Sequence, residues 1–277
     1  MKKLLTLIIL ISSFVSAQFY EVEYQVQPQI HFTDKALESL KQYYPDQKQR
    51  NEFLELAKKI PTVNYNFKYN QSESQSQVIL KLDNSQQENS NPLAITPEIG
   101  DKPIFKYSEN LYFNEIDMFT GNKLLVYDSL QKVNFIETGK TKNILGFEVK
   151  EATAKYKNYD LIAWYAPKIP YVYSPDKFYG TKGLILELHY KYMRDDIEVM
   201  ISWNAIKKKE SKKAPVFKIN NQLKKVSQAE FFKMIEDSNQ IQREENNQGI
   251  DKNNYITHEK IINTNYFNFK FCKRTIL

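Results

Sequence analysis

The sequence contains few of the residues on which disulfide-rich and catalytic proteins depend. Its 277 residues include one cysteine (Cys272), seven glycines and three histidines. A single cysteine cannot form a disulfide within the chain, so stability has to come from packing. No GxSxG, HExxH or CxxC pattern occurs in the sequence. Nucleophilic and metal-assisted catalysis therefore have no recognisable motif here, and no cofactor is expected.

Long apolar runs are also absent, apart from one at the N-terminus. Residues 1–17 combine Lys2 and Lys3, an apolar run from Leu4 to Ile11, and a small residue at Ala17. This pattern predicts a secretory signal peptide that is cleaved after Ala17, and a secreted or periplasmic protein. The run is shorter than the roughly 20 residues that span a bilayer, so no transmembrane segment is expected once it is removed.

Composition indicates a folded protein with a modest charge. Apolar residues make up 42% of the chain, which is enough for a large core, and the formal net charge of +6 is mild. Secretion also argues against nucleic acid as a partner. The 19 tyrosines and 17 phenylalanines could line a site for an apolar small molecule, or could simply form core.

Alternation of apolar and polar residues recurs far more often than helical spacing, which predicts a mainly β (α+β) fold. Strands are expected from Val63 and, at short intervals, from Ile104 to Ile206. Brief polar turns between them, at 120–122, 139–141 and 194–196, favour an antiparallel meander that forms a curved sheet or half-barrel.

Two helical intervals interrupt the strands. The first is an N-terminal insertion over residues 34–60, which Pro45 should divide. The second covers residues 227–240 and begins with a capping box, Ser227 with Glu230. We expect one β-rich domain over residues 18–240, with a polar loop at 83–92 and a polar, disordered tail at 241–277.

A segment rich in proline precedes the most apolar strand. Pro167, Pro170 and Pro175 make it stiff and extended, and they exclude it from the centre of a sheet. It is expected to be an ordered loop crossing the sheet. Gly180 and Gly183 would then turn the chain, through positive φ, into a strand beginning at Leu184.

These residues carry a resemblance to a known family. The order of Gly146, 163–165, the three prolines and the sequence 177–185 resembles the GLPGLI family of secreted bacterial proteins, over about residues 141–187. The family motif corresponds to Gly180-Thr181-Lys182-Gly183-Leu184-Ile185. The resemblance implies a secreted β-rich protein of unknown activity. Its motif and loop residues are Trp164, Tyr165, Pro167, Pro170, Pro175, Lys177, Phe178, Gly180, Gly183, Leu184 and Ile185.

The chain departs from the family pattern at several positions. Thr181-Lys182 replaces Leu-Pro between the glycines, Ser174-Pro175-Asp176 replaces Gly-Pro-Trp, and Val149 replaces a frequent cysteine. The turn is therefore expected to lack a proline restraint, and the loop to lack an aromatic anchor. The sequence resembles a divergent member.

Few residues are candidates for catalysis or metal binding. Glu187 and His189 share one face of the strand from Leu184 and could begin a metal site, although a third ligand would have to come from elsewhere and a solvated strand face has the same pattern. His31 and His258 lie in weakly patterned segments. The lysine run from Lys207 is typical of a solvated turn.

Two functions remain open from the sequence alone. One is a non-enzymatic envelope protein that binds an apolar small molecule or a partner protein. The alternative is a small hydrolase or metal-dependent enzyme that uses Glu187 and His189.

Overall fold

We describe a computed structural model of the protein, over residues 19–79, 99–118, 121–194, 196–211 and 213–247. The predicted signal peptide, the polar loop at 83–92, and residues from 248 onward, with His258 and Cys272, lie outside the described residues. Among the described helices, none has both the length and the apolar composition needed to cross a membrane.

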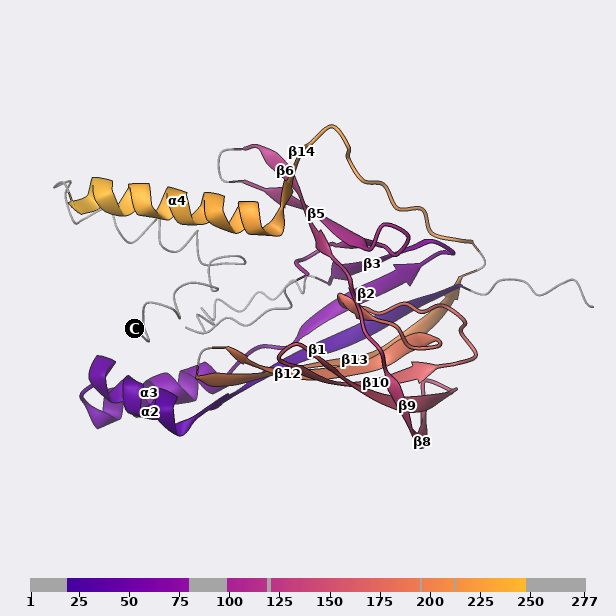
Figure 1. Ribbon diagram of the computed structural model, residues 1–277, viewed down its shortest axis with the longest axis horizontal. Coiled ribbons are helices and arrows are strands. Elements are labelled where there is room, and N and C mark those ends of the chain that lie inside the picture. The colour runs from indigo at the N-terminus through magenta and orange to yellow at the C-terminus, as the bar shows by residue number, and fades with distance from the viewer. Residues whose placement is uncertain (1–18, 80–98, 119–120, 195, 212, 248–277) are drawn as a thin grey trace, which may run out of the picture.

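Twelve strands form one sheet in the order β14-β6-β5-β4-β3-β2-β1-β13-β12-β10-β9-β8, with β14 and β8 at its edges (Figure 1). The pairs are antiparallel except for β14 with β6, and a separate two-stranded pair of β11 with β7 is also parallel. The predicted curved, mainly antiparallel sheet is confirmed. The strands are β1 (Phe19–Phe32), β2 (Val63–Tyr69), β3 (Glu73–Val78), β4 (Ile104–Lys106), β5 (Leu111–Asp117), β6 (Lys123–Ser129), β7 (Gln131–Lys132), β8 (Ile136–Ile144), β9 (Phe147–Tyr156), β10 (Tyr159–Ala166), β11 (Phe178–Tyr179), β12 (Leu184–Arg194), β13 (Ile197–Ser211) and β14 (Lys224–Ser227).

Strand β1, which the sequence analysis did not predict, lies in the middle of the sheet between β2 and β13. Its 14 residues alternate between the two faces, as a half-buried strand should. Pairing with β2 ends at Val26, so Pro28 lies where β1 has only β13 as a neighbour. Sheets tolerate proline at such edge positions.

The inner face of the sheet carries the main core. We define the inner face as the face that carries Val22, Tyr24, Tyr65, Phe67 and Trp203, which are all at most 2% exposed. The rings pack at angles, with centroids 5.9 Å apart for Tyr24 and Phe67 and 4.8 Å apart for Tyr65 and Trp203. Such contacts add to the stability gained from burial. These aromatic residues are therefore core.

The N-terminal helical insertion consists of α2 (Asp34–Tyr43) and α3 (Gln47–Lys58), separated at Pro45 as predicted. The Thr33 side chain accepts a hydrogen bond from Ala36 N at the start of α2, and Asp46 does the same for Gln49 N at the start of α3. Both helices contact β1. Their buried residues Ala36, Leu40 and Ala57 join the main core.

The C-terminal helix α4 (Gln228–Asn247) begins with the predicted capping box. Ser227 N donates to Glu230 Oε2 at 2.7 Å, and Glu230 N donates to Ser227 Oγ at 3.2 Å. Val226 and Phe231 pack with β5 and β6 in a second hydrophobic cluster. The helix continues past Gln240 to Asn247, so the predicted tail cannot begin at residue 241.

Two turn predictions were wrong. Residues 139–141 lie within β8, where the register with β9 shifts between Glu137 and Thr141 and Gly139 has a φ of +82°. The extra residues form an irregularity in the strand instead of ending it. The lysine run from Lys207 also belongs to a strand, because β13 continues to Ser211 opposite β1.

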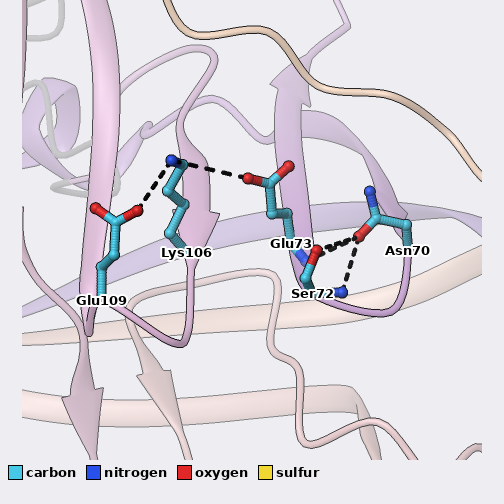
Figure 2. A network of polar contacts seen from close by, with 5 residues as sticks. All are labelled: Asn70, Ser72, Glu73, Lys106 and Glu109. Atoms are coloured by element: carbon cyan, nitrogen blue, oxygen red, sulfur yellow. Dashed lines mark hydrogen bonds and ion pairs between the residues drawn. The ribbon is translucent and has the colours of Figure 1, made fainter.

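A small polar network closes the turn between β2 and β3 and links it to β4 (Figure 2). Asn70 Oδ1 accepts from Ser72 N and Glu73 N, both at 2.9 Å, which is an Asx turn. On the next strand, Lys106 Nζ lies 2.9 Å from Glu109 Oε1 and 4.0 Å from Glu73 Oε1. One ammonium group thus offsets part of the charge of two carboxylates.

Candidate functional site

The segment 167–183 crosses the inner face and is hydrogen-bonded to strands that are far apart in the sequence. Ser76 Oγ of β3 donates to Pro175 O at 2.6 Å. Gln131 N of β7 donates to Lys177 O at 2.8 Å, and Ile185 N of β12 donates to Tyr173 O at 3.1 Å. We call residues 167–183 the crossing loop.

Asp176 anchors the crossing loop from inside the core. Asp176 is 1% exposed. Its Oδ2 accepts hydrogen bonds from Tyr190 Oη at 2.8 Å and Trp203 Nε1 at 2.9 Å. Oδ1 accepts from Lys177 N at 2.6 Å. A buried carboxylate is tolerated only with such donors. The position where the resemblance implies an aromatic anchor therefore holds a polar one.

The glycines of the motif permit close approach of backbone segments. A Cβ on Gly183 would lie 2.2 Å from Ala166 O, and one on Gly180 would lie 2.2 Å from Val133 O. Gly180 has a φ of +133°, whereas Gly183 is not among the glycines with positive φ. The prediction of a left-handed Gly183 was wrong. The glycine is required because β10 passes directly beside it.

The other motif residues are divided between the two faces. Tyr165, Phe178, Leu184 and Ile185 are at most 2% exposed, which places them in the core. Trp164 is half-buried on the opposite side, where Lys142 Nζ lies 4.2 Å from the centroid of its ring. Pro167 and Pro170 are exposed and Pro175 is buried.

Two tyrosine rings of the crossing loop stack on one another and on Tyr107. Tyr107 and Tyr173 have centroids 4.3 Å apart at an interplanar angle of 19°. Tyr171 stacks on Tyr173 with centroids 5.4 Å apart. Burial is the largest cause that raises the pKa of Tyr173 to about 12, with the neighbouring Tyr171 adding to it. Burial also raises the pKa of Tyr107.

Glu187 and His189 lie on the same face of β12 as predicted, with His189 Nε2 3.5 Å from Glu187 Oε2. The same carboxylate oxygen is 2.5 Å from Lys142 Nζ. Partial burial raises the pKa of Glu187, but the hydrogen bonds from His189 and Lys142 outweigh burial and the pKa lies below its usual value. In the described part of the chain, no three His, Cys, Asp or Glu residues are grouped to hold a metal ion.

Glu187 and His189 each belong to a row of neighbouring side chains that runs across the four strands β1, β13, β12 and β10. In one row Gln25 of β1 is opposite Asn204 of β13, which is opposite Glu187, which is opposite Trp164. In the adjacent row Gln27, Ser202, His189 and Ile162 follow one another in the same way. We call the surface made by these eight residues the outer face. Sequence reasoning missed its β1 members, although their alternation with Tyr24 and Val26 was a usable signal.

Residues 113–187 match the model of a family described as "Protein of unknown function (Porph_ging)". The match runs from β5 into β12 and includes the crossing loop and both motif glycines. No curated protein matches the sequence.

Solved structures of another protein resemble the chain distantly. They are PNGF-II in the C2 space group, at 16% identity and a TM-score of 0.43, and PNGF-II in the P21 space group, at 15% identity and a TM-score of 0.41. The aligned regions cover 79% and 77% of this chain, and 33% of the PNGF-II chain in each case. The chain thus spans about a third of the length of PNGF-II.

The tyrosine stack predicts a loss of stability at alkaline pH. Unfolded tyrosines ionise near pH 10, whereas Tyr173 in the folded state holds its proton until about pH 12. Because the folded pKa is raised, the stabilisation is fully present below about pH 10 and is lost as the pH rises toward 12. Urea midpoints measured from pH 8 to 11 should fall above pH 10, and less steeply for Tyr173→Phe. Tyr43→Phe in α2 should keep the wild-type dependence, and identical slopes for all three proteins would contradict the prediction.

Replacing Asp176 should destabilise the protein strongly. Asp176→Ala leaves the Trp203 and Tyr190 donors without this acceptor inside the core, at a cost of about 2–4 kcal/mol in the free energy of unfolding. Asp160→Ala, which removes an exposed carboxylate 3.3 Å from Lys155, should cost less than about 0.5 kcal/mol. Urea unfolding of both variants gives the comparison. Equal shifts would mean that the buried hydrogen bonds do not hold the loop.

The close approach at Gly183 gives a further test. Gly183→Ala places a methyl group against Ala166 O and forces the backbones apart, which should destabilise the fold by about 1–3 kcal/mol. The adjacent Lys182→Ala removes only an exposed ion pair with Glu137 and should change stability by less than about 0.5 kcal/mol. Thermal or urea midpoints distinguish the two. A Gly183→Ala variant as stable as Lys182→Ala would refute the role of backbone contact.

Proposed function

We propose that the chain is a secreted or periplasmic protein similar to the GLPGLI family, without catalytic activity, that binds a component of the cell envelope through its outer face. The N-terminal pattern of residues 1–17 supports the location. The match to a family of unknown function over residues 113–187 is compatible with the GLPGLI resemblance, which covers about residues 141–187 of the same region.

The observation that carries this proposal is the difference between the two faces of the sheet. The inner face is filled by aromatic side chains and by the crossing loop, so its tyrosines and phenylalanines serve packing. The outer face instead presents polar side chains around Ile162, which is 41% exposed. Ile162 and Trp164 are two residues apart on the same face of β10, and an apolar patch with a polar rim is typical of an interaction surface. This contrast favours the outer face over an apolar pocket as the site of binding.

The alternative, an enzyme based on Glu187 and His189, gains no support from their surroundings. Glu187 forms an ion pair with Lys142, so its charge is already compensated and its pKa is lowered, whereas a general acid needs a raised pKa. The pair is part of the wider polar surface and does not lie at the centre of a cluster of ligands.

The proposal is tested by retention on envelope fragments. Purified protein lacking residues 1–17 is mixed with washed envelopes of the producing bacterium and sedimented. Ile162→Glu introduces a charge at one of the two apolar positions of the outer face and should weaken retention at least about tenfold, the equivalent of 1.4 kcal/mol. Val216→Glu makes the same kind of change at a residue that is 80% exposed and lies outside this face, and should leave retention unchanged.

The opposite results are equally clear. If the wild-type protein is not retained, or if Ile162→Glu and Val216→Glu are retained equally well, the outer face is not the binding surface.

A further inference from the structure

Building on the proposed function, we infer that the ligand of the outer face is an uncharged glycan. The first reason is the set of side chains that stand on it. Gln25 and Asn204 are partners on neighbouring strands, and Gln27 and Ser202 are partners in the next row. Within the described residues, these four side chains make no hydrogen bond to another part of the protein.

Amide side chains suit sugar hydroxyls for a chemical reason. Each amide has both a donor and an acceptor, fixed in one plane, and each hydroxyl can act as either. Two neighbouring hydroxyls on a sugar ring therefore match one amide with two hydrogen bonds. Strands lie about 4.8 Å apart, so successive amides across β1 and β13 form a regular row that can meet successive parts of a chain of sugars.

The charges of this part of the sheet are the second reason. Lys142 with Glu187, Lys155 with Asp160, and Lys191 with Glu198 are paired at 2.5, 3.3 and 3.5 Å. Lys140 with Glu151 adds a fourth pair at 3.0 Å. An anionic ligand such as an acidic polysaccharide or a lipid headgroup is bound by cations without acidic partners. At these four positions the cations already have acidic partners, which favours an uncharged ligand beside them.

The apolar residues of the outer face supply the third reason. Trp164 and Ile162 are two residues apart on β10 and both point to this face, with Glu187 and His189 opposite them on β12. An aromatic ring and an aliphatic side chain fit the C–H face of a sugar ring. A protein partner would instead require a contiguous apolar centre with several aromatic anchors. Of the eight residues that make up the outer face, only these two are apolar.

The test uses the envelope fragments introduced above, after treatments that destroy one class of ligand at a time. Periodate cleaves neighbouring sugar hydroxyls, and proteinase K removes accessible proteins. The inference predicts that periodate abolishes retention of the wild-type protein and that proteinase K does not. Retention should also be the same at low and high salt, because no charge pairing is involved.

Variants of the amides connect the ligand to this surface. Asn204→Ala and Gln25→Ala should each weaken retention on untreated fragments about tenfold, by removing hydrogen bonds worth on the order of 1.4 kcal/mol. Gln47→Ala, which removes an exposed amide on α3, should not change it. Urea midpoints confirm that the variants are folded. For the fluorescence measurement below, Trp164→Phe is preferred to Trp164→Ala because it keeps an aromatic ring at this position.

A spectroscopic measurement gives an independent readout. The chain has two tryptophans, and Trp203 on the inner face is 0% exposed, whereas Trp164 is half-buried on the outer face. Oligosaccharides released from the fragments by hydrolysis should reduce acrylamide quenching of Trp164 fluorescence. The Trp164→Phe variant, which retains only Trp203, should show no such change.

The outcomes separate this inference from the proposed function. Retention that proteinase K removes and periodate does not, still weakened by Ile162→Glu, overturns the glycan and leaves the binding proposal intact. Retention that high salt abolishes also overturns an uncharged ligand. No retention, or retention insensitive to Ile162→Glu, overturns both.

Discussion

The hydrogen bonds from Trp203 and Tyr190 to the Asp176 carboxylate are the contacts on which the rest of this structure depends. They join the crossing loop to β13 and β12, near the middle of a sheet whose core is otherwise aromatic. A carboxylate in such surroundings is costly unless each oxygen has a donor, and here both oxygens do. The same requirement makes the position of the loop specific, because any other placement leaves buried polar groups unpaired.

Closing the inner face in this way determines where function can lie. Gly180 and Gly183 let the loop backbone touch its neighbours, and Ser76 and Gln131 bind it at two further points. Tyr107, Tyr171 and Tyr173, which could have lined a cavity, are instead stacked on one another. With one face fully packed, the other face is the one available to the ligand that we propose, and it carries Gln25, Asn204 and Trp164.

Local signals in the sequence predicted much of the fold. The capping box at Ser227, the break at Pro45 and the alternating strands after Ile104 are each encoded within a few residues, and the structure contains all of them. Strand β1 was missed because Pro28 argues against a central strand, and because its pairing with β13 joins residues at opposite ends of the domain. The outer face was missed with it, since two of its residues come from β1.

Other features cannot be read from a single segment. Gly183 is explained by Ala166 at the end of β10, and its own neighbours in the sequence suggested a turn instead. Gly139 and the lysines from Lys207 resemble turns in composition, yet pairing with β9 and β1 keeps both in strands. The role of Asp176 also depends on residues distant in the sequence. A lone aspartate after a proline indicates a solvated loop, and only the contacts with Trp203 and Tyr190 show that it is buried.

The two tryptophans illustrate how one sheet can separate stability from the binding that we propose. Trp203 on β13 points inward, where its indole N–H is used by Asp176 and its ring by Tyr24 and Tyr65. The next residue, Asn204, points outward into the row that contains Trp164. Because successive residues of a strand face opposite sides, the outer residues can change without disturbing the contacts of the core. Divergence in ligand is therefore expected to appear at positions such as Asn204 and Gln25, while Trp203 and its acceptor stay coupled.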